Sequence, residues 1–534
     1  ELAKWLDSEL VESDYRPTKL KEGVLLEEEV EFNDDTTEQG DLEDLLDGYL
    51  KENKQVLVFM NARKRAEQMS HKMALLTKIV IEEKDKKVLD KVSHEVLESL
   101  ESPTEQCISL SNAIKQGAAF HHAGLVGKQR ELVEENFKNG KIKILCSTPT
   151  LAAGLNLPAD IVIIPSLYRF EKYGMELLSV REIKQMCGRS GRPKFSTEGK
   201  SILVASSEAQ KELFLEKYVH GQIEQIVSRL GIIPILRTHV LALIATNYIR
   251  NIKTIESFFE KTLYAHQLQN MGELLDNVLE IVNSLEEYKF VERKGEEFTA
   301  TLLGRRVSDL FLDPESAHAL VEALNARKTF TNFSYLYAWV NCAEFMPWMR
   351  PPSKARPLMM EELSERIDEL PFSQEKTLYE PESTEKFFSA LMLEKWINEK
   401  KEQDLFSEYG LAPGTLFGKI QIIEWLSYST IELGKVLGQE RHNIMAQKIG
   451  RRIKYGVKEE LLMLVELRGV GRARARKLFA AGIKKPSEVK TNLAKVEAIL
   501  GKKVADELAR QLITKEEGKK NDAVEKENTA QTAL

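Results

Sequence analysis

The sequence has few cysteines and no long apolar run, and both absences narrow the kind of protein it encodes. Its four cysteines, Cys107, Cys146, Cys187 and Cys342, lie far apart and form no Cys-x-x-Cys pair. This spacing argues against a structural zinc site or a disulfide framework and favours a reducing compartment. No run of about 18 apolar residues and no secretory signal pattern occurs. We therefore expect a cytoplasmic protein without a membrane span.

A phosphate-binding loop is also missing from these residues. The one Gly-Lys-Ser, Gly199-Lys200-Ser201, has Lys194 where the loop motif needs its first glycine. It also precedes a predicted strand, whereas a phosphate loop follows a strand and opens a helix. No acidic magnesium motif of the Asp-Glu-x-His type occurs. We expect this chain by itself to lack the groups that hold nucleotide phosphates and magnesium.

The length and composition are those of a globular protein with several domains. At roughly 150 residues per domain, 534 residues suggest three or four domains. Apolar residues make up 43% and charged residues 30%, which excludes a disordered, collagen-like or small disulfide-rich chain. Because the chain opens with Glu1 rather than Met, we expect it to be a piece of a longer protein.

The charge is unevenly distributed. The net charge of -7 argues weakly against a nucleic-acid binder, but residues 441–485 hold 13 basic and three acidic residues, whereas residues 1–50 hold 17 acidic and four basic ones. A local basic stripe forms an electrostatic footprint for phosphate even in an acidic chain. The alternative is a solvated helical face, and charge alone does not decide between them.

Strands and helices alternate over about 180 residues near the start of the chain. Continuous apolar runs, each typical of a strand buried on both faces, occur at Gln55–Met60, Ala118–Phe120, Ile142–Cys146, Ile161–Pro165 and Ser201–Ala205. We predict a parallel-sheet α/β domain over residues 26–212, preceded at residues 1–25 by a short helix and a strand, with an acidic linker at Glu27–Asp47.

The remainder is predicted to be mainly helical. Helices followed by a hairpin at Tyr288–Gly295 and Glu297–Ala300 predict a winged helix over residues 213–305. Residues 306–455 form a helical domain broken by the stretch Pro347–Pro357. Residues 456–514 form a small helical unit around a glycine hairpin, and the polar tail 515–534 is expected to be disordered. The fold class is therefore multidomain, α/β plus mainly α.

An arginine motif, Gln185-Met-Cys-Gly188-Arg189-Ser-Gly191-Arg192-Pro193, precedes the last strand. Two arginines three residues apart, with glycines between them, can converge on one compact anion. Arginine fingers neutralise a transferring phosphoryl group in this way. The alternative is an ordinary basic turn.

Three more motifs stand at strand ends, where open α/β sheets place their ligands. They are Val56 to Arg65, Phe120-His121-His122-Ala-Gly-Leu125 and Ser147-Thr148-Pro-Thr-Leu-Ala-Ala-Gly154-Leu-Asn156-Leu-Pro158. The histidine pair has no third ligand nearby. We therefore prefer a nucleic-acid-contacting or structural loop to a metal site.

Two features of the C-terminal half also point to DNA. On a helix over about Thr415–Leu437, Leu416, Ile420 and Ile423 share a face, and Trp425 points about 180° away from Leu416. Trp425 is either a base-stacking platform or a contact to a neighbouring domain. The glycine hairpin around Gly469 and Gly471 makes a phosphate nest, followed by Arg472, Arg474 and Arg476. The alternative for this hairpin is a plain helix cap.

In their order and spacing, these motifs resemble the second RecA-like half of superfamily 2 helicases. The likeness is closest to archaeal Hjm-type DNA-repair helicases, which are relatives of superkiller-type RNA helicases and of the helicase part of DNA polymerase theta. It covers nearly the whole chain and implies a RecA-like domain, a winged helix, a helical ratchet domain and a helix-hairpin-helix domain. Residues 1–25 resemble the end of a first RecA-like domain, which would hold the phosphate loop.

The resemblance assigns a role to each group of candidate residues. Gln185, Arg189 and Arg192 would face ATP and Mg2+ held mainly by the first half, with Gly154, Asn156 and Gly188 nearby. The residues implied to contact DNA are Asn61, Arg63, His122, Thr148, Tyr168 and Phe170 on a strand-separating hairpin, Trp425 with Lys419, and Gly469, Gly471, Arg472, Arg474 and Arg476. The ratchet helix of the family carries an arginine two turns before its tryptophan, where this sequence has Gly418. No metal ligand is expected.

The expected function is that of the C-terminal portion of an ATP-dependent 3′-to-5′ DNA helicase. The resemblance implies single-stranded and forked DNA, together with repair or replication proteins, as partners. By itself the chain is expected to bind single-stranded DNA without hydrolysing ATP. Two alternatives are a non-catalytic DNA-binding adaptor and a superkiller-type RNA helicase fragment.

Overall fold

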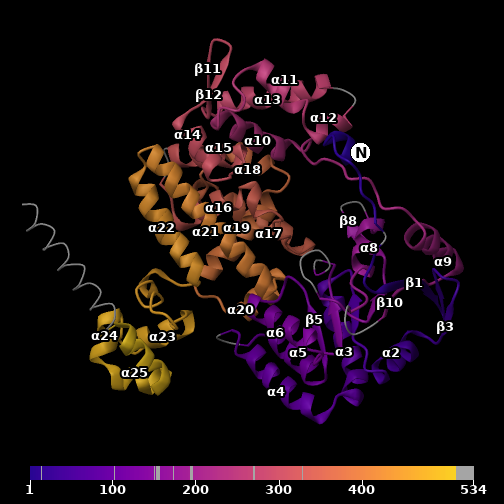
Figure 1. Ribbon diagram of the computed structural model, residues 1–534. Coiled ribbons are helices and arrows are strands. Elements are labelled where there is room, and N and C mark those ends of the chain that lie inside the picture. Colours follow the sequence, from indigo (N-terminus) through magenta and orange to yellow (C-terminus); the bar gives the residue numbers. More distant parts are fainter. Residues whose placement is uncertain are drawn as a thin grey trace, which may run out of the picture. The chain divides into compact units, whose positions relative to one another are not determined.

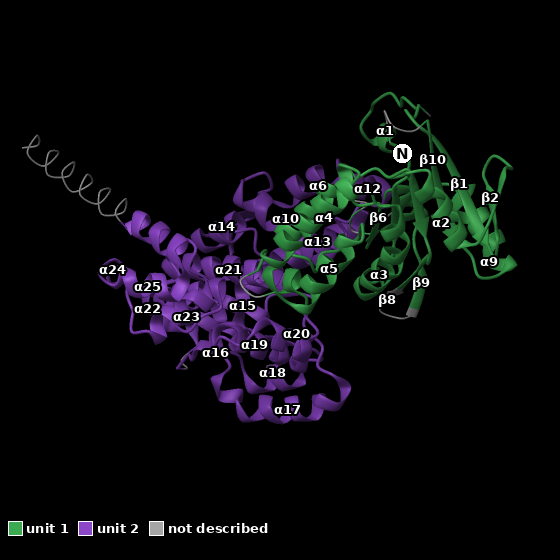
Figure 2. Ribbon diagram, turned by 90° about the horizontal axis from the view of Figure 1, so that it is seen from below, with its two compact units in different colours: residues 1–226, 412–417 green, residues 227–411, 418–534 purple. Residues whose placement is uncertain are grey.

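The computed structural model describes residues 1–13, 15–100, 103–149, 151, 157–171, 174–192, 197–268, 271–326 and 329–512. The side chains of residues 170, 171, 174 and 376 lie outside this description. The chain divides into two compact units (Figure 2), residues 1–226 with 412–417 and residues 227–411 with 418–534. The predicted tail, residues 515–534, lies outside the described residues.

The first unit, whose elements run from indigo to magenta in Figure 1, is built on an eight-stranded sheet in the order β3-β2-β1-β10-β7-β4-β6-β5. All neighbouring strands from β1 to β5 along this order are parallel, and β2 and β3 are antiparallel. The strands are β1 (Lys19–Leu26), β2 (Glu29–Phe32), β3 (Thr37–Gln39), β4 (Val56–Phe59), β5 (Ala118–His121), β6 (Ile144–Ser147), β7 (Ile161–Ile164) and β10 (Glu198–Val204). The predicted parallel sheet is confirmed.

Both faces of the central strands β4, β5, β6 and β7 are buried, as their continuous apolar runs predicted. In β4, Val56 and Val58 enter one buried cluster, whereas Leu57 and Phe59 enter the other. Successive side chains of a strand point to opposite faces, so every position of β4 is covered by apolar neighbours. The helices of this unit are α1 (Leu2–Trp5), α2 (Leu42–Lys51), α3 (Arg63–Val80), α4 (Glu83–Leu97), α5 (Glu105–Lys115), α6 (Gly127–Lys138), α8 (Val180–Cys187), α9 (Glu208–Phe214) and a π-helical turn, η1 (Leu215–Val219).

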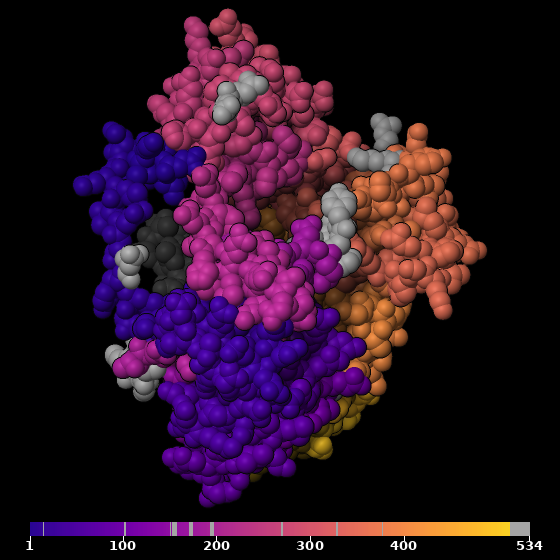
Figure 3. Space-filling view, turned by 90° about the vertical axis from the view of Figure 1, so that its right-hand side faces the viewer, coloured from indigo at the N-terminus to yellow at the C-terminus, as the bar shows by residue number. Residues whose placement is uncertain are grey.

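The predicted boundary at residue 25 and the predicted acidic linker were wrong. β1 pairs with β10 inside the sheet, and β2, β3 and α2 occupy most of residues 27–47. β2 alternates between the outward Glu29 and Glu31 and the buried Val30 and Phe32, so its outward acids resemble a linker in composition. The N-terminal residues of this unit are indigo in Figure 3.

The second unit begins with helices and a short hairpin. The elements are α10 (Ile233–Ala245), α11 (Ile252–Phe259), α12 (Leu263–Gln267), α13 (Met271–Glu287), β11 (Val291–Lys294), β12 (Glu297–Ala300), α14 (Leu302–Asp309) and α15 (Pro314–Asn325). The predicted hairpin is confirmed by the antiparallel pairing of β11 with β12. Leu236, Val240 and Ile244 are buried on one face of α10, which leaves its opposite face toward solvent.

The helical part that follows surrounds α19 (Ser383–Ile397), which is buried on nearly all sides. Its other helices are α16 (Asn332–Val340), α17 (Arg356–Glu365), α18 (Gln374–Tyr379), α20 (Glu402–Tyr409), α21 (Pro413–Val436) and α22 (Glu440–Tyr455). A separate apolar cluster holds together α23 (Arg472–Ala480), α24 (Pro486–Thr491) and α25 (Leu493–Leu500). No helix among the described residues is both long and apolar enough to cross a membrane.

Candidate nucleotide and nucleic-acid interface

The arginine motif forms a turn between α8 and β10 whose backbone is fixed from several sides. Arg16 Nη2 donates to the carbonyl oxygens of Gly188 (3.3 Å) and Ser190 (2.7 Å). Ala159 accepts from the amide of Gly191 at 2.7 Å and donates to the carbonyl of Arg189 at 3.0 Å. These contacts place the turn at the amino edge of β7 and β10.

Gly191 is required in this turn for two reasons. Its φ is +89°, a region that side-chain-bearing residues rarely adopt. A Cβ at this position would also lie 2.7 Å from Thr18 Cγ2. The segment that carries Arg16 and Thr18 therefore presses against the arginine turn and determines its shape.

The structure places three predicted residues, Gly188, Arg189 and Arg192, in this turn and Gln185 in the last turn of α8 just before it. Gln185 and Gly188 are exposed, and both arginines are partly exposed. Burial lowers the pKa of Arg189, and Arg192 Nη2 donates to the carbonyl of Lys138 at 3.2 Å. Two guanidinium groups on one short turn suit the recognition of a polyanion such as a nucleotide phosphate. Gly154 and Asn156 lie outside the described residues.

At the opposite, carboxyl edge of the sheet lie residues that follow β4 and β6. Asn61 Nδ2 donates to the carbonyl of Tyr168 (2.8 Å) and to Ser166 Oγ (3.3 Å). Arg63 begins α3, and its Nη1 donates to Thr415 Oγ1 at 2.6 Å. Thr148 is largely buried just after β6. The three motifs that were predicted to stand at strand ends do so.

The histidine pair is structural, which corrects the expectation that His122 touches DNA. His122 is fully buried, its Nε2 lies 3.1 Å from Glu67 Oε1, and its Nδ1 accepts from the amide of Gly124 at 3.1 Å. His121 Nε2 lies 2.9 Å from Glu134 Oε1. With both ring nitrogens engaged inside the protein, His122 has no atom left for DNA. No group of three metal-binding side chains occurs in the described part of the chain.

The predicted hairpin is present as β8 (Tyr168–Glu171) and β9 (Gly174–Leu177). Besides the contacts of Asn61, an ion pair of 2.8 Å joins Arg169 Nη1 to Glu182 Oε1 on α8. Tyr168 is partly buried at the base of the hairpin. The side chain of Phe170 and the tip lie outside the described residues.

On α21, the predicted core face is confirmed, since Leu416, Ile420 and Ile423 are at most 3% exposed. Trp425 is partly exposed, and its indole Nε1 donates to the carbonyl of Leu310 at 3.2 Å. The ring is therefore anchored at its nitrogen against the segment that follows α14. This contact matches the alternative in which Trp425 packs against a neighbouring part of the chain.

Lys419 does not lie on a DNA-accessible surface, which corrects its predicted role. The side chain is 5% exposed, and its Nζ donates to the backbone carbonyls of Phe345 and, at 2.8 Å, Pro347. It also lies 4.2 Å from the centre of the Phe345 ring. Burial lowers the pKa of Lys419 to about 8. An ammonium group enclosed in this way holds a loop to α21 and is not available to a phosphate.

The segment around Gly469 and Gly471 leads directly into α23, and two of the three arginines that follow it are engaged within the protein. Gly469 has a φ of +85°, and Gly471 precedes the first turn of α23. Arg472 lies 4.5 Å from the centre of a ring of Trp396, and Arg476 Nε donates to Glu399 Oε2 at 2.8 Å.

Those two arginines fasten α23 to the segment after α19, and this occupies groups that were expected to contact DNA. Arg474 is exposed, and its Nη1 donates to the carbonyl of Gly469 at 2.7 Å. Of the three arginines, Arg474 is therefore the one whose side chain faces solvent.

Sequence reasoning gave Arg16 no role, because nothing in the order of residues shows that a side chain near the N-terminus contacts a turn near residue 190.

Two family models match the chain. Residues 72–194 match the helicase conserved C-terminal domain, and residues 333–456 match archaeal helicase, domain 4. The first match covers β5, β6, β7 and the arginine turn, and the second covers most of the helical part around α19. The two matches support the expected fold class, a RecA-like domain together with helical domains.

Curated relatives match along nearly the whole chain. The chain is 34% identical to the ATP-dependent DNA helicase Hel308 of Methanococcus vannielii, a match that covers 95% of the chain and 74% of that protein. It is 35% identical to the ATP-dependent DNA helicase Hel308 of Pyrococcus horikoshii, with 96% and 72% covered. The protein of the same name from Methanocella arvoryzae is 34% identical, with 96% and 70% covered. The chain thus belongs to the family of Hel308-type archaeal DNA helicases.

Proposed function

We propose that this chain is the part of an ATP-dependent DNA helicase that holds DNA and senses ATP, in a protein that moves 3′ to 5′ on forked or repair DNA. The observation that carries the proposal is the turn from Gly188 to Arg192 at the end of α8. Its backbone is held by Arg16 and Ala159, and it presents two guanidinium groups at one edge of a parallel sheet. The direction of movement and the preference for forked DNA are inferred from the family resemblance.

In this proposal, Arg189 and Arg192 neutralise the negative charge on the γ-phosphate of ATP. Phosphoryl transfer has little covalent chemistry for a protein to perform, so catalysis depends on positioning and electrostatic stabilisation. Gln185, Gly188, Gly154 and Asn156 would border the same nucleotide. Mg2+ and most of the ATP would be held by groups outside this chain.

The DNA contacts proposed for the first unit lie at the other edge of its sheet. Arg63 and Thr148 would meet the phosphate backbone, and Asn61 would support the hairpin through the carbonyl of Tyr168. An aromatic hairpin residue such as Tyr168 or Phe170 is suited to replace the base stack that is lost when a duplex opens.

In the second unit, the proposed contacts are Trp425, Gly469, Gly471 and Arg474. An exposed aromatic face stacks on a base without regard to its identity, which suits a motor that must move along any sequence. Backbone amides at Gly469 and Gly471, with Arg474, would hold phosphates in the same sequence-independent way.

The chain by itself is proposed to bind single-stranded DNA without hydrolysing ATP. Gly199, Lys200 and Ser201 lie inside β10, and Lys200 Nζ pairs with Glu38 Oε2 at 2.9 Å. A lysine in the middle of a strand and paired with a carboxylate does not cradle phosphates. Single-stranded DNA and partner proteins of repair or replication are the proposed partners.

The test is a pair of measurements on the purified chain. Fluorescence anisotropy with matched labelled DNA and RNA 20-mers measures binding, and phosphate release in the presence of unlabelled DNA measures ATPase activity. We expect DNA binding, a preference for DNA over RNA, and no ATP hydrolysis. Tighter binding of RNA than of DNA would support a superkiller-type RNA helicase. DNA-stimulated ATPase activity of the chain alone would contradict the proposal that ATP and Mg2+ are held mainly by groups outside it. If a longer protein that contains this chain also lacked ATPase activity, the alternative of a non-catalytic DNA-binding adaptor would be supported.

A further inference from the structure

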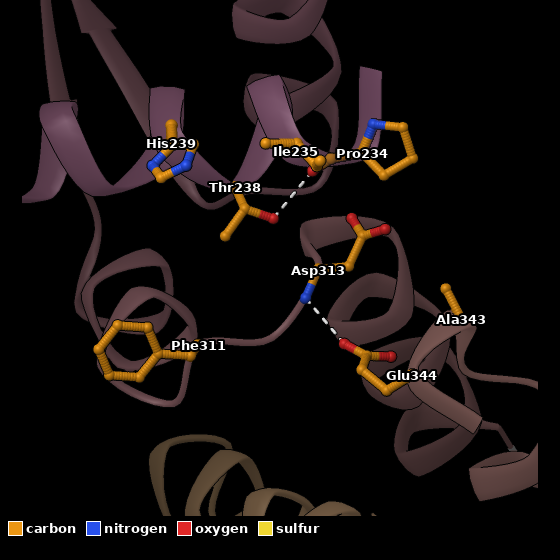
Figure 4. Close-up of a pocket in the computed structure, with 8 residues that line it drawn as sticks. All are labelled: Pro234, Ile235, Thr238, His239, Phe311, Asp313, Ala343 and Glu344. Carbon is orange, nitrogen blue, oxygen red and sulfur yellow. Dashed lines mark hydrogen bonds between the residues drawn. The ribbon is translucent and has the colours of Figure 1, made fainter. Parts of the chain in front are cut away.

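Two adjoining cavities lie along the solvent-facing side of α10 in the second unit. The first, of about 370 Å3, is lined by α10 residues, by Phe311 and Asp313, and by Ala343 and Glu344 (Figure 4). The second, of about 270 Å3, is lined by the following turns of α10 and by the end of α11. His239 borders both cavities. They therefore form neighbouring parts of one helix face.

The first cavity carries an excess of negative charge. Arg237 forms two hydrogen bonds of 2.8 Å to the carboxylate of Asp313 and a contact of 2.7 Å to Glu315. Glu344 Oε1 accepts from the amide of Asp313 at 2.9 Å. Asp313 and Glu344 thus line the cavity with two carboxylates, and the guanidinium group of Arg237 is already engaged by Asp313 and Glu315.

Glu344 also has an unsatisfied atom. Its Oε2 is buried and has no hydrogen-bond partner among the described residues. A buried acceptor without a donor costs free energy, and the cost is larger for a charged group. The negative charge of Glu344 is therefore poorly compensated within the described residues, and the carboxylate side of the cavity favours a cation over an anion.

Phe311 provides an aromatic surface on the other side of the same cavity. Its side chain is 80% exposed, and its φ is +56°, which is rare for a bulky residue. Phe311 directly follows the C-cap of α14, and this backbone conformation directs its ring away from the core toward the cavity. Figure 4 shows the rings of Phe311 and His239 on one side of the cavity and the carboxylates of Asp313 and Glu344 on the other. An aromatic face attracts the guanidinium group or the alkyl stem of arginine.

The second cavity is predominantly apolar. Ala242 and Leu243 of α10 and Phe258 and Phe259 of α11 contribute to its wall. Such a wall accepts a bulky aliphatic side chain. Thr238, in the first cavity, and Leu243, in the second, are five residues apart on α10, which corresponds to about 7.5 Å along the helix.

We propose that this face of α10 binds a peptide segment of a protein partner through an arginine and a nearby bulky apolar residue. The arginine enters the first cavity, between the Phe311 ring and the carboxylate of Glu344, and the apolar side chain fills the second cavity. In an extended peptide, residues separated by one position are about 6.8 Å apart, close to the spacing of the two cavities. DNA fits this face poorly, because its phosphates would approach an excess of carboxylates.

The test uses the full chain and a set of fluorescein-labelled 12-residue Gly-Ser peptides. Each peptide carries one Arg and one Leu separated by zero to four residues, and matched peptides replace Arg with Glu or Leu with Ser. Anisotropy measures binding. We expect the Arg peptide with the best spacing to bind at least ten-fold more tightly than its Glu counterpart, and the Leu-to-Ser change to weaken binding at least three-fold.

Variants of the chain assign the binding to these cavities. Phe311→Asn removes the ring but keeps a residue that tolerates positive φ, Glu344→Gln removes the charge but keeps the acceptor for Asp313, and Ala242→Trp fills the second cavity. Each should weaken the best peptide at least five-fold. Tyr379→Ala and Glu287→Gln, which remove an exposed ring and an exposed charge outside both cavities, should leave binding unchanged.

Three results would overturn the proposal. The first is that no peptide binds, and the second is that the three cavity variants bind the peptides as the unaltered chain does. The third is that a labelled dT 20-mer displaces the peptide and loses affinity in Phe311→Asn, which would assign the cavity to single-stranded DNA instead. Circular dichroism of each variant checks that the helices remain folded.

Discussion

Arg16 and Ser190 are 174 positions apart in the chain, yet Arg16 Nη2 donates to the Ser190 carbonyl at 2.7 Å. The same nitrogen reaches the carbonyl of Gly188, so one guanidinium group spans the backbone on both sides of Arg189. Burial lowers the pKa of Arg16, although an arginine keeps its charge at any physiological pH. The side chain that fixes the arginine turn therefore comes from the segment just before β1.

Replacing Arg16 with alanine should loosen this turn. Loss of two charge-assisted hydrogen bonds to partly buried carbonyls is expected to cost about 1–2 kcal/mol of the stability of the first unit. Hydrogen–deuterium exchange of residues 185–192 should increase, and the urea midpoint should fall. Arg181→Ala removes an exposed arginine from α8 and serves as the control. Equal exchange in the two variants would mean that Arg16 does not hold the turn.

Trp425 combines a structural hydrogen bond with a partly exposed ring, and two substitutions separate these properties. Trp425→Ala should weaken binding of single-stranded DNA by about 1–3 kcal/mol, the usual loss of one base–aromatic stack. Trp425→Phe keeps an aromatic face and loses the hydrogen bond to Leu310, so it should retain most of the affinity. If both variants lost affinity equally, the contact to Leu310 and not stacking would explain the effect.

Lys419 and Arg474 should differ in how they affect the salt dependence of DNA binding. Each phosphate neutralised on a single strand contributes about -0.7 to the slope of log affinity against log salt. Arg474→Ala should therefore make the slope shallower by about that amount. Lys419→Met should leave the slope unchanged, because its ammonium group is enclosed by backbone carbonyls. A shallower slope in Lys419→Met would mean that the lysine reaches DNA after all.

Buried histidine should make the first unit less stable in mild acid. Burial lowers the pKa of His121 below its ordinary value of 6.5, so the folded state favours the neutral ring. The unfolded chain then binds more protons as the pH falls below about 6.5, and stability decreases with it.

Urea unfolding between pH 7 and pH 5 measures this dependence. His121→Asn should show a smaller loss of stability over this range than the unaltered chain. His94→Asn, at an exposed position on α4, should keep the original dependence and is the control. The same slope in His121→Asn and the unaltered chain would exclude His121 as the group responsible.

The elements that sequence reasoning located well are those with a clear apolar pattern. The strands β4, β5, β6, β7 and β10 were predicted because continuous apolar runs indicate a sheet that is buried on both faces. The buried face of α21 was predicted from the spacing of Leu416, Ile420 and Ile423. The spacing of apolar residues indicates which side of a helix or strand is buried, and the buried side chains at these positions confirm the prediction.

What remained hidden depends on contacts between distant parts of the chain. β2 and β3 were read as a linker because their outward acids outweigh their few buried residues. Lys419 was expected to face DNA because lysine is usually exposed, but the carbonyls of Phe345 and Pro347 provide it with buried acceptors. Arg472 and Arg476 were expected to contact phosphates, whereas Trp396 and Glu399 engage them instead. The local sequence pattern around a residue does not indicate which distant residue it will contact in the folded chain.

The measurement that tests the central claim most directly is binding of a labelled dT 20-mer to the purified chain across a salt series, with ATP hydrolysis measured in the same samples. The account predicts binding that weakens steeply with salt, a reduction on Trp425→Ala, and no phosphate release. Absence of DNA binding at low salt, or DNA-stimulated ATP hydrolysis by this chain alone, would contradict it.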